Sequence, residues 1–225
     1  PNPSVVWFKA DGSVTVGRQA KWNINGYSDV PGNNFISSVK THLGENRSFR
    51  VASQPKPAIE VAAEVFRFLL RQAREEHSLT VKEGLVSIPV DFHGHARREL
   101  RLAAEQAGFY VKTFIHEPFA AVVAYCLGQQ GQPEQELEGR NILVFDWGGG
   151  TLDITLAAVR SGRMIQVEKG DLGQRAGDYF DEKLMRLSHH RFLETSDLTI
   201  EQASISASLK DRYLRECERV KMELS

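Results

Sequence analysis

Three consecutive glycines between two β-rich runs constrain this chain more than any other feature of its sequence. They lie in VFDWGGGTLD, residues 144–153, with ILVF just before and DITLAAV just after. No helix follows the glycines directly, so the pattern fits neither the G-x-G-x-x-G dinucleotide turn nor the GxxxxGK[ST] phosphate loop. The pattern therefore predicts a β-hairpin whose tip contains Gly148, Gly149 and Gly150.

Such a hairpin has two interpretations, a purely structural one and a functional one. In the structural interpretation, the glycines only supply the positive φ angles of a tight turn. In the functional one, successive glycine N–H groups form a concavity that binds an anion, and Thr151 adds a hydroxyl donor. Because a hairpin brings its ends together, Asp146 and Asp153 would lie at the same mouth. Two carboxylates beside a phosphate suit Mg²⁺.

The bulk composition bounds the class of protein. The 225 residues suffice for one large domain or two small ones, and the formal net charge of −1 gives no sign of nucleic acid or of a membrane surface as partner. No apolar run approaches the ~20 residues of a membrane span. Cys126 and Cys217 form neither a metal-type spacing nor a disulfide framework, which favours a reducing, cytoplasmic compartment.

Predicted strands and helices alternate along the chain, which indicates the α/β class. The expected strands are 4–8, 13–17, 85–90 (buried), 110–115, 141–145, 153–159 and 164–169. The expected helices are 35–43, 59–73, 95–107, 119–127, 178–192 and a last one that begins with a capping box at Thr199 and Gln202. Residues 45–58 are polar with two prolines and are expected to form a loop, and residues 129–140 make the best internal boundary.

Several stretches, in the same order along the chain, resemble the heat-shock seventy-kilodalton chaperone family of the DnaK type. DWGGGTLDITL resembles its second phosphate loop, D-L-G-G-G-T-F-D. The other matching stretches are FISSVKTHLG, VSIPVDFHGHARRELRLAAEQAGFYVKTFIHEPFAAVVAYCLG, GDLGQRAGDYFDEKL and CERVKMELS. The resemblance implies an actin-like ATPase (ribonuclease H-like) fold with two lobes, incomplete at both ends.

The resemblance also implies lobe boundaries. We expect a lobe I part at 1–130, with a trimmed subdomain IB at about 1–58 and part of subdomain IA at about 59–130, and a lobe II part at 131–225, with subdomain IIA at about 141–193 and the start of subdomain IIB at about 194–225. The family's first phosphate hairpin, G-I-D-L-G-T-T, and its later adenosine motif have no counterpart here. We therefore expect this chain alone to hydrolyse ATP very poorly, if at all.

The implied cofactors are ATP or ADP with Mg²⁺, and K⁺ as a further ion. By resemblance, Asp146 and Asp153 contact the metal through water, while Gly148, Gly149, Gly150 and Thr151 hold the phosphates. Glu117 matches the glutamate that orients the metal and the attacking water, and Lys40 matches the catalytic lysine. On the residues alone, Lys40 is predicted to be a solvated helix lysine. Glu117 could be a surface acid at a helix start, but Pro118 fixes the turn around it and favours the functional role.

Further roles are carried over from the same resemblance. Gly177 matches a glycine near the nucleotide, and Glu218, Lys221 and Ser225 match adenosine contacts. Their i, i+3 and i+7 spacing places the last three on one helix face, which an ordinary polar face would also show. In addition, Pro89 and Arg97 match a relay between the nucleotide and the substrate domain, although Pro89 could merely end a strand.

The predicted function is that of an ATP-binding domain from a DnaK-like stress-response chaperone. The alternatives are an actin-superfamily sugar kinase or phosphatase, and a non-catalytic nucleotide-sensing scaffold. The implied partners are a nucleotide-exchange factor, a J-domain cochaperone, and client peptides bound through a domain that this chain lacks. Thr113, His116 and Trp147 replace the family's arginine, asparagine and leucine. The first two changes fall where the J-domain docks, which weakens the expectation of that partner.

Overall fold

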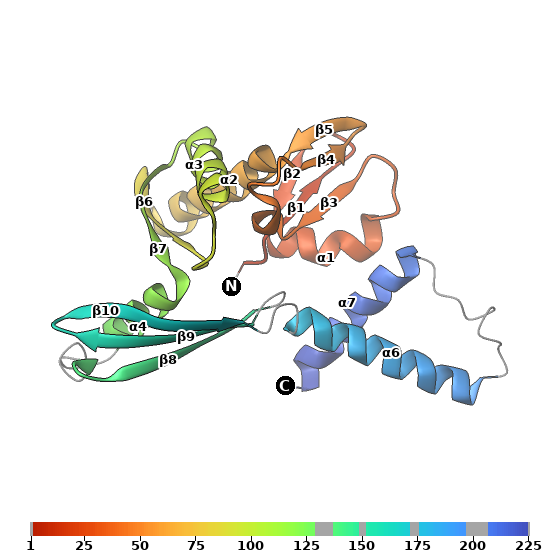
Figure 1. Ribbon diagram of the computed structural model, residues 1–225. Helices are drawn as coiled ribbons and strands as arrows, with labels where there is room; N and C mark the ends of the chain where they lie inside the picture. Colours follow the sequence, from red (N-terminus) through yellow and green to blue (C-terminus); the bar gives the residue numbers. More distant parts are fainter. Residues whose placement is uncertain (1, 129–136, 149–151, 172–175, 197–206, 225) are drawn as a thin grey trace. The chain divides into compact units, whose positions relative to one another are not determined.

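The computed structural model describes residues 2–128, 137–148, 152–171, 176–196 and 207–224 (Figure 1). The chain divides into two compact units, Pro1–Glu117 and Pro118–Ser225. No helix within the described ranges is long and apolar enough to cross a membrane.

The first unit begins with an antiparallel sheet of three strands in the order β2-β1-β3. Strand β1 is Val5–Phe8, β2 is Val14–Val16 and β3 is Asn34–Ser37. The β1–β2 turn is held by the Asp11 carboxylate, which accepts hydrogen bonds from the Ser13 N–H at 2.8 Å and its hydroxyl at 2.7 Å. The two strands expected at this end of the chain are thus confirmed.

The helix predicted at 35–43 is wrong. Phe35 lies in β3 opposite Trp7, and the two rings stack at 5.1 Å between centroids. Ser38 then adopts φ 54°, and only a single 3₁₀ turn, η1 (Val39–His42), follows. The four-residue spacing misled because Phe35 is held by its cross-strand neighbour, whereas Val39 and Leu43 reach the core from a turn. A further helix, α1 (Arg18–Tyr27), precedes β3 and was not predicted from the sequence.

A second hairpin replaces the loop predicted at 45–58. Strands β4 (Ser48–Val51) and β5 (Gln54–Pro57) pair antiparallel. The two residues between them, Ala52 and Ser53, have φ angles of 47° and 66°, as a tight type I′ turn requires. The prolines are tolerated because this sheet has only two strands and each is an edge.

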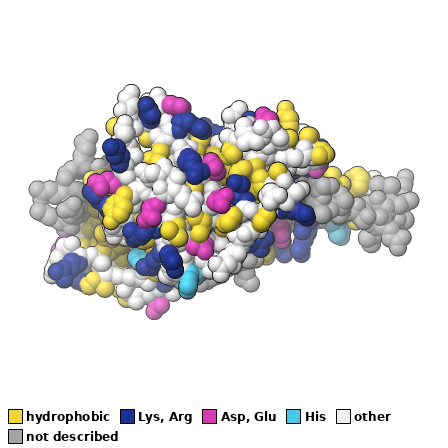
Figure 2. Space-filling model, turned by 90° about the horizontal axis from the view of Figure 1, so that it is seen from above, with side chains coloured by type: hydrophobic (Ala, Val, Ile, Leu, Met, Phe, Trp, Pro, Cys, Tyr) yellow, Lys and Arg dark blue, Asp and Glu magenta, His cyan; other side chains and the backbone are white. Residues whose placement is uncertain are grey.

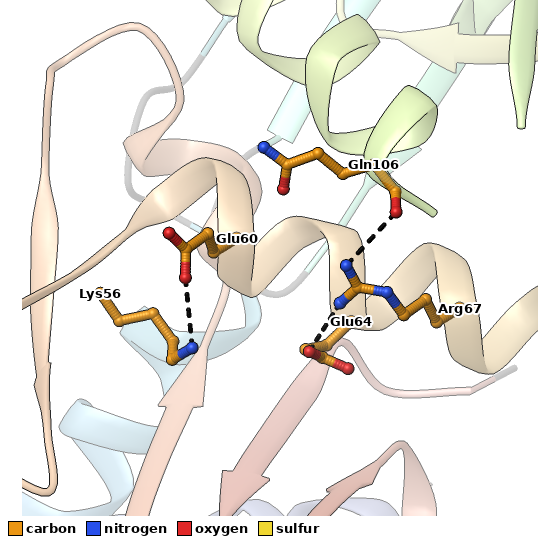
Figure 3. A network of polar contacts seen from close by, with 5 residues as sticks. All are labelled: Lys56, Glu60, Glu64, Arg67 and Gln106. Atoms are coloured by element: carbon orange, nitrogen blue, oxygen red, sulfur yellow. Dashed lines mark hydrogen bonds and ion pairs between the residues drawn. The ribbon is translucent and has the colours of Figure 1, made fainter. Parts of the chain in front are cut away.

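Two helices cover the core of the first unit. Helix α2 (Ala58–His77) and helix α3 (Gly94–Gln106) confirm the predictions made from their apolar stripes. The buried cluster between these helices and the strands includes Val6, Val61 and Ala103, each fully inaccessible to solvent. Figure 3 shows polar contacts along α2: Lys56 pairs with Glu60 at 3.2 Å, and Arg67 joins Glu64 at 2.7 Å to the Gln106 carbonyl of α3 at 3.3 Å.

A βαβ unit completes this half of the chain. Strands β6 (Glu83–Ile88) and β7 (Tyr110–His116) run parallel, with α3 between them in sequence. Ile88 is buried, but Leu85 is 60% exposed, so the predicted burial of this strand is wrong over most of its length. Helix α4 (Glu117–Gly128) starts directly where β7 ends and contains the helix predicted at 119–127.

The second unit is built on an antiparallel sheet in the order β10-β9-β8. Strand β8 is Asn141–Trp147, β9 is Leu152–Arg160 and β10 is Arg163–Asp171. Two helices, α6 (Gly177–Thr195) and α7 (Ala207–Leu224), pack against each other. The predicted capping box at Thr199 and Gln202 lies outside the described residues.

On the face of the molecule drawn in Figure 2, basic and acidic side chains are interspersed, which is consistent with the net charge of −1.

Candidate functional site

The glycine hairpin brings together the two aspartates that the sequence singles out. In the β8–β9 register, Asp146 lies directly opposite Asp153, and Trp147 lies opposite Leu152. Residues directly opposite each other in an antiparallel pair project from the same face of the sheet. The prediction that both carboxylates lie at one mouth is therefore confirmed. The predictions made for Gly149, Gly150 and Thr151 concern residues outside the described ranges.

The sheet adds two residues that the sequence reasoning missed. Asp171, the last residue of β10, pairs in register with Asp153 on its other side. Lys169 reaches over from β10, and its Nζ lies 3.7 Å from Asp153 Oδ1. Alternate residues of a strand share one face of the sheet, so Lys169 and Asp171 can both be placed beside Asp153 once the pairing of β10 with β9 is known. Sequence alone offered only the G-D of GDLGQRAG as a signal.

The start of helix α6 is tied to the glycine loop. The Gly177 N–H donates to the Gly148 carbonyl at 3.2 Å. Both glycines were predicted to lie near the nucleotide, and the structure brings them together. The Tyr179 and Phe180 N–H groups donate to the Ala176 carbonyl at 3.1 and 3.4 Å, so the loop contact of α6 is made by the Gly177 N–H.

An exposed aromatic group flanks this junction. The rings of Trp147 and Phe180 are 5.8 Å apart between centroids, and Tyr179 contacts Phe180 at 6.1 Å. Trp147 remains 59% exposed. The replacement of leucine by tryptophan is thus accommodated by packing against α6.

Two predicted catalytic residues meet in the first unit. Lys40, on the 3₁₀ turn η1, donates from Nζ to Oε1 of Glu117, the first residue of α4. Their side chains are 41% and 26% exposed. Pro118 occupies the first turn of α4, where a missing N–H costs nothing, and so fixes the chain beside Glu117. These residues are 77 positions apart in sequence, and only the family resemblance could have paired them.

The predicted relay residues share one neighbour. The Phe92 N–H donates to the Pro89 carbonyl at 3.2 Å, and Arg97 Nε donates to the Phe92 carbonyl at 2.6 Å. The turn between β6 and α3 therefore links Pro89 to Arg97 through the backbone of Phe92. His93 caps α3 by accepting from the Ala96 N–H at 3.3 Å.

The predicted adenosine residues lie on α7. Lys221 Nζ donates to the Gly177 carbonyl at 3.1 Å and lies 2.7 and 2.8 Å from the two carboxylate oxygens of Asp181. Asp181 is buried, with 8% of its side chain exposed. Glu218 lies one turn earlier and is half-buried, and Ser225 lies outside the described residues. The structure therefore brings Lys221, from this set, into contact with Gly177, the glycine predicted to lie near the nucleotide.

Burial also governs the cysteine on α7. Cys217 is 4% exposed, and this burial, reinforced by the negative charge of Asp181, raises the pKa of its thiol.

A separate apolar cavity of about 400 Å³ opens between α4 and β8. It is lined by apolar side chains and contains none of the predicted site residues; examples are Ala121, Tyr125, Leu143 and Phe145.

The donor set fits Mg²⁺ held through water. Within the described ranges, no group of three or more His, Cys, Asp or Glu residues could hold a metal ion. Mg²⁺ keeps several waters and is usually bound by one or two carboxylates together with substrate phosphates. The facing pair Asp146 and Asp153 supplies that number of carboxylates.

The elements described above define a mixed α/β protein with several small sheets, and comparison with known proteins places it more closely. The Hsp70 protein family model matches residues 48–225. The chain is 29% identical over 225 residues to the chaperone protein DnaK of Mycoplasma mycoides subsp. mycoides SC. It is 28% identical over 224 residues to that of Thermosipho africanus, and 26% over 223 residues to that of Thermosipho melanesiensis.

The chain belongs to the Hsp70 family. This membership implies the actin-like ATPase fold and confirms the predicted class. Each comparison covers 99% of this chain but 35% of the relative, so the chain spans well under half the length of the curated relatives it matches.

Proposed function

We propose that this chain forms the nucleotide-binding part of a DnaK-like molecular chaperone. The observation that carries the proposal is the β8–β9 register, which sets Asp146 opposite Asp153 at the mouth of the glycine loop. The hydrogen bond from Gly177 to Gly148 supports it, because it adds a helix start to the same place. Family membership supports ATP or ADP as the ligand.

The hairpin receives the phosphate and metal roles in this proposal. Asp146 and Asp153 contact Mg²⁺ through water, while the glycine N–H groups and Thr151 hold the phosphate oxygens. A bound Mg²⁺ would neutralise charge on the phosphates. The protein's own contribution is to present fixed donors, so that little reorganisation is needed when the nucleotide arrives.

Lys40 and Glu117 receive the chemical roles. Phosphoryl transfer to water depends mostly on positioning and on charge stabilisation. Glu117 orients the attacking water and the metal, and Lys40 supplies a compact positive charge to the transferred phosphate. Their contact keeps each side chain in place, because the carboxylate neutralises the ammonium. Hydrolysis by this chain alone is expected to be very weak.

The remaining assignments follow the family pattern. Glu218, Lys221 and Ser225 contact the adenosine, and Gly177 lies near the nucleotide. The link from Pro89 to Arg97 relays the nucleotide state. A nucleotide-exchange factor, a J-domain cochaperone and client peptides are the proposed partners of the whole chaperone, with cytoplasmic location. Thr113 and His116 make the J-domain contact the weakest of these.

Calorimetric titration with ADP and Mg²⁺ tests the proposal. The protein is expected to bind one ADP, and Asp153→Asn is expected to weaken binding by about tenfold, since it removes one charge-assisted contact. The control is Asp29→Asn at an exposed position of the first unit. Absence of ADP binding by the wild type would overturn the proposal. So would equal affinity of wild type and Asp153→Asn.

A steady-state ATPase assay tests the chemical roles separately. We expect turnover by this chain near background, with Lys40→Ala no lower than the exposed-lysine control Lys82→Ala. Robust turnover that depends on Lys40 would refute the expectation that this chain alone is nearly inactive, while leaving the binding proposal intact.

A further inference from the structure

The charges at the mouth of the glycine hairpin are unbalanced without a third residue. Asp146 and Asp153 face each other across β8 and β9. Like charges directly opposite each other in a sheet are destabilising, and a phosphate approaching such a pair meets further repulsion. A cation at this position therefore decides how well the site accepts an anion.

Lys169 supplies such a cation from the neighbouring strand. In the β10–β9 register it lies opposite Thr155, one diagonal step from Asp153. A diagonal neighbour is within reach of a long side chain, and the ammonium lies 3.7 Å from the Asp153 carboxylate. Thr155 itself is 2% exposed, so the stem of the lysine crosses a covered part of the sheet.

The pair is shielded from solvent more than a surface ion pair. The side chains of Lys169 and Asp153 are only 18% and 24% exposed, whereas those of the cross-strand pair Lys112–Glu83 are 56% and 51% exposed. Partly buried charges are screened less by salt than exposed ones. The attraction between Lys169 and Asp153 therefore persists at ionic strengths that weaken the exposed pair.

We propose that Lys169 is a positioning residue of the nucleotide site, whose ammonium holds Asp153 and gives the carboxylate pair a fixed positive charge. This inference rests on the proposed function for its ligand. By simple addition of unit charges, Lys169 makes the net charge of the side chains at this mouth one unit less negative. Lys169 therefore favours the phosphates of ADP when no metal is present and disfavours a divalent cation when no nucleotide is present.

These two effects have opposite signs, and a merely structural role would not produce both. Lys169→Met removes the charge and keeps the length of the side chain. Mn²⁺ titrated without nucleotide and followed by electron paramagnetic resonance is expected to bind this variant about fivefold more tightly than wild type. ADP titrated in the presence of a chelator is expected to bind it about tenfold more weakly.

Three comparisons complete the experiment. Saturating Mg²⁺ is expected to reduce the ADP difference to less than about threefold, because the metal replaces the lost charge. Lys169→Arg keeps the charge and is expected to behave like wild type. Lys112→Met removes the lysine of the exposed cross-strand pair and is expected to change neither titration. Lys169→Gln serves as a second neutral variant should Lys169→Met fail to fold.

The outcomes separate this inference from the proposed function. Unchanged or weaker Mn²⁺ binding by the neutral variants would overturn the role of Lys169, whatever the ADP titrations show. Equal ADP affinity of wild type and neutral variant in chelator would do the same. If wild type binds no ADP under any condition, the proposed function fails, and the Mn²⁺ titration still decides whether Lys169 controls the charge of the carboxylate pair.

Discussion

Gly44 lies two residues after the 3₁₀ turn that carries Lys40, and substituting it by alanine should be costly for two reasons. Its φ is +86°, a left-handed conformation that side chains disfavour. A Cβ atom there would lie 2.3 Å from His93 Cε1 and 2.8 Å from the backbone nitrogen of Ala96. The backbone of α3 cannot yield without disturbing its own hydrogen bonds, so the loop must move.

The expected loss in the free energy of unfolding is the sum of a backbone cost and a steric cost. The left-handed backbone costs an L-residue about 1–2 kcal/mol. Forcing a methyl group into a packed contact adds about 1–3 kcal/mol. Gly108 provides the matched control, because its φ is +83° but a Cβ there would have no neighbour within 4 Å. We therefore expect Gly44→Ala to lower the free energy of unfolding by about 2 kcal/mol more than Gly108→Ala.

Urea unfolding followed by tryptophan fluorescence measures this difference. Both glycines lie in the first unit, together with Trp7, which is buried, and Trp22. A Trp147→Phe background confines the signal to that unit. Equal destabilisation by the two substitutions would refute the steric argument. Movement of the loop in Gly44→Ala should also loosen Lys40. The Gly44 N–H donates to the Glu99 carboxylate at 2.6 Å, and this contact anchors the loop next to the turn that carries Lys40.

Three further predictions concern single side chains. Lys221→Met leaves buried Asp181 without its cation and should lower the free energy of unfolding by about 2 kcal/mol in thermal melts. Cys126 should react with a thiol reagent at pH 8 well before Cys217, whose pKa is raised by burial, so that little of it is thiolate. Two N–H groups of the β9–β10 turn lower the pKa of Glu138, so its stabilisation is present above the ordinary pKa of a glutamate and is lost as the pH falls through the lowered pKa. Stability of Glu138→Gln should therefore fall less steeply in acid.

Each of these predictions has its own control or contrary outcome. Lys210→Met, at an exposed position on the same helix, should change the melting curve little. An equal loss from both lysine variants would contradict the role of the buried carboxylate. Labelling of Cys126→Ser as fast as wild type would show that Cys217 is not protected. Parallel acid unfolding curves for wild type and Glu138→Gln would remove the proposed contribution of the turn.

The sequence predicted those elements in which local pattern and tertiary packing agree. The β8–β9 hairpin follows from two strand-like runs around glycines, and α2 follows from its apolar stripe. The prediction of a buried strand at 85–90 was wrong at Leu85. An apolar run suggested burial, although only Ile88 of strand β6 is buried. Phe35 misled because a spacing of four residues fits a strand followed by a turn as well as a helix.

Other features lacked a local signal altogether. The turn at Ala52 and Ser53 has the geometry of a two-residue hairpin without the usual Asn-Gly, so nothing marked it. The contact of Lys169 with Asp153 depends on the β10–β9 register, which includes a shift between Gln166 and Glu168. Such a shift cannot be counted from sequence, and residues near the hairpin mouth are for that reason harder to predict than the hairpin itself.

Hydrogen exchange of backbone amides tests the central claim most directly, because it locates the bound nucleotide along the chain. With ADP and Mg²⁺ present, the account predicts slower exchange at residues 147–153 and at Gly177, and no change in the β4–β5 hairpin. Protection that appears elsewhere while residues 147–153 exchange as fast as before would contradict the claim that the glycine hairpin binds the phosphates.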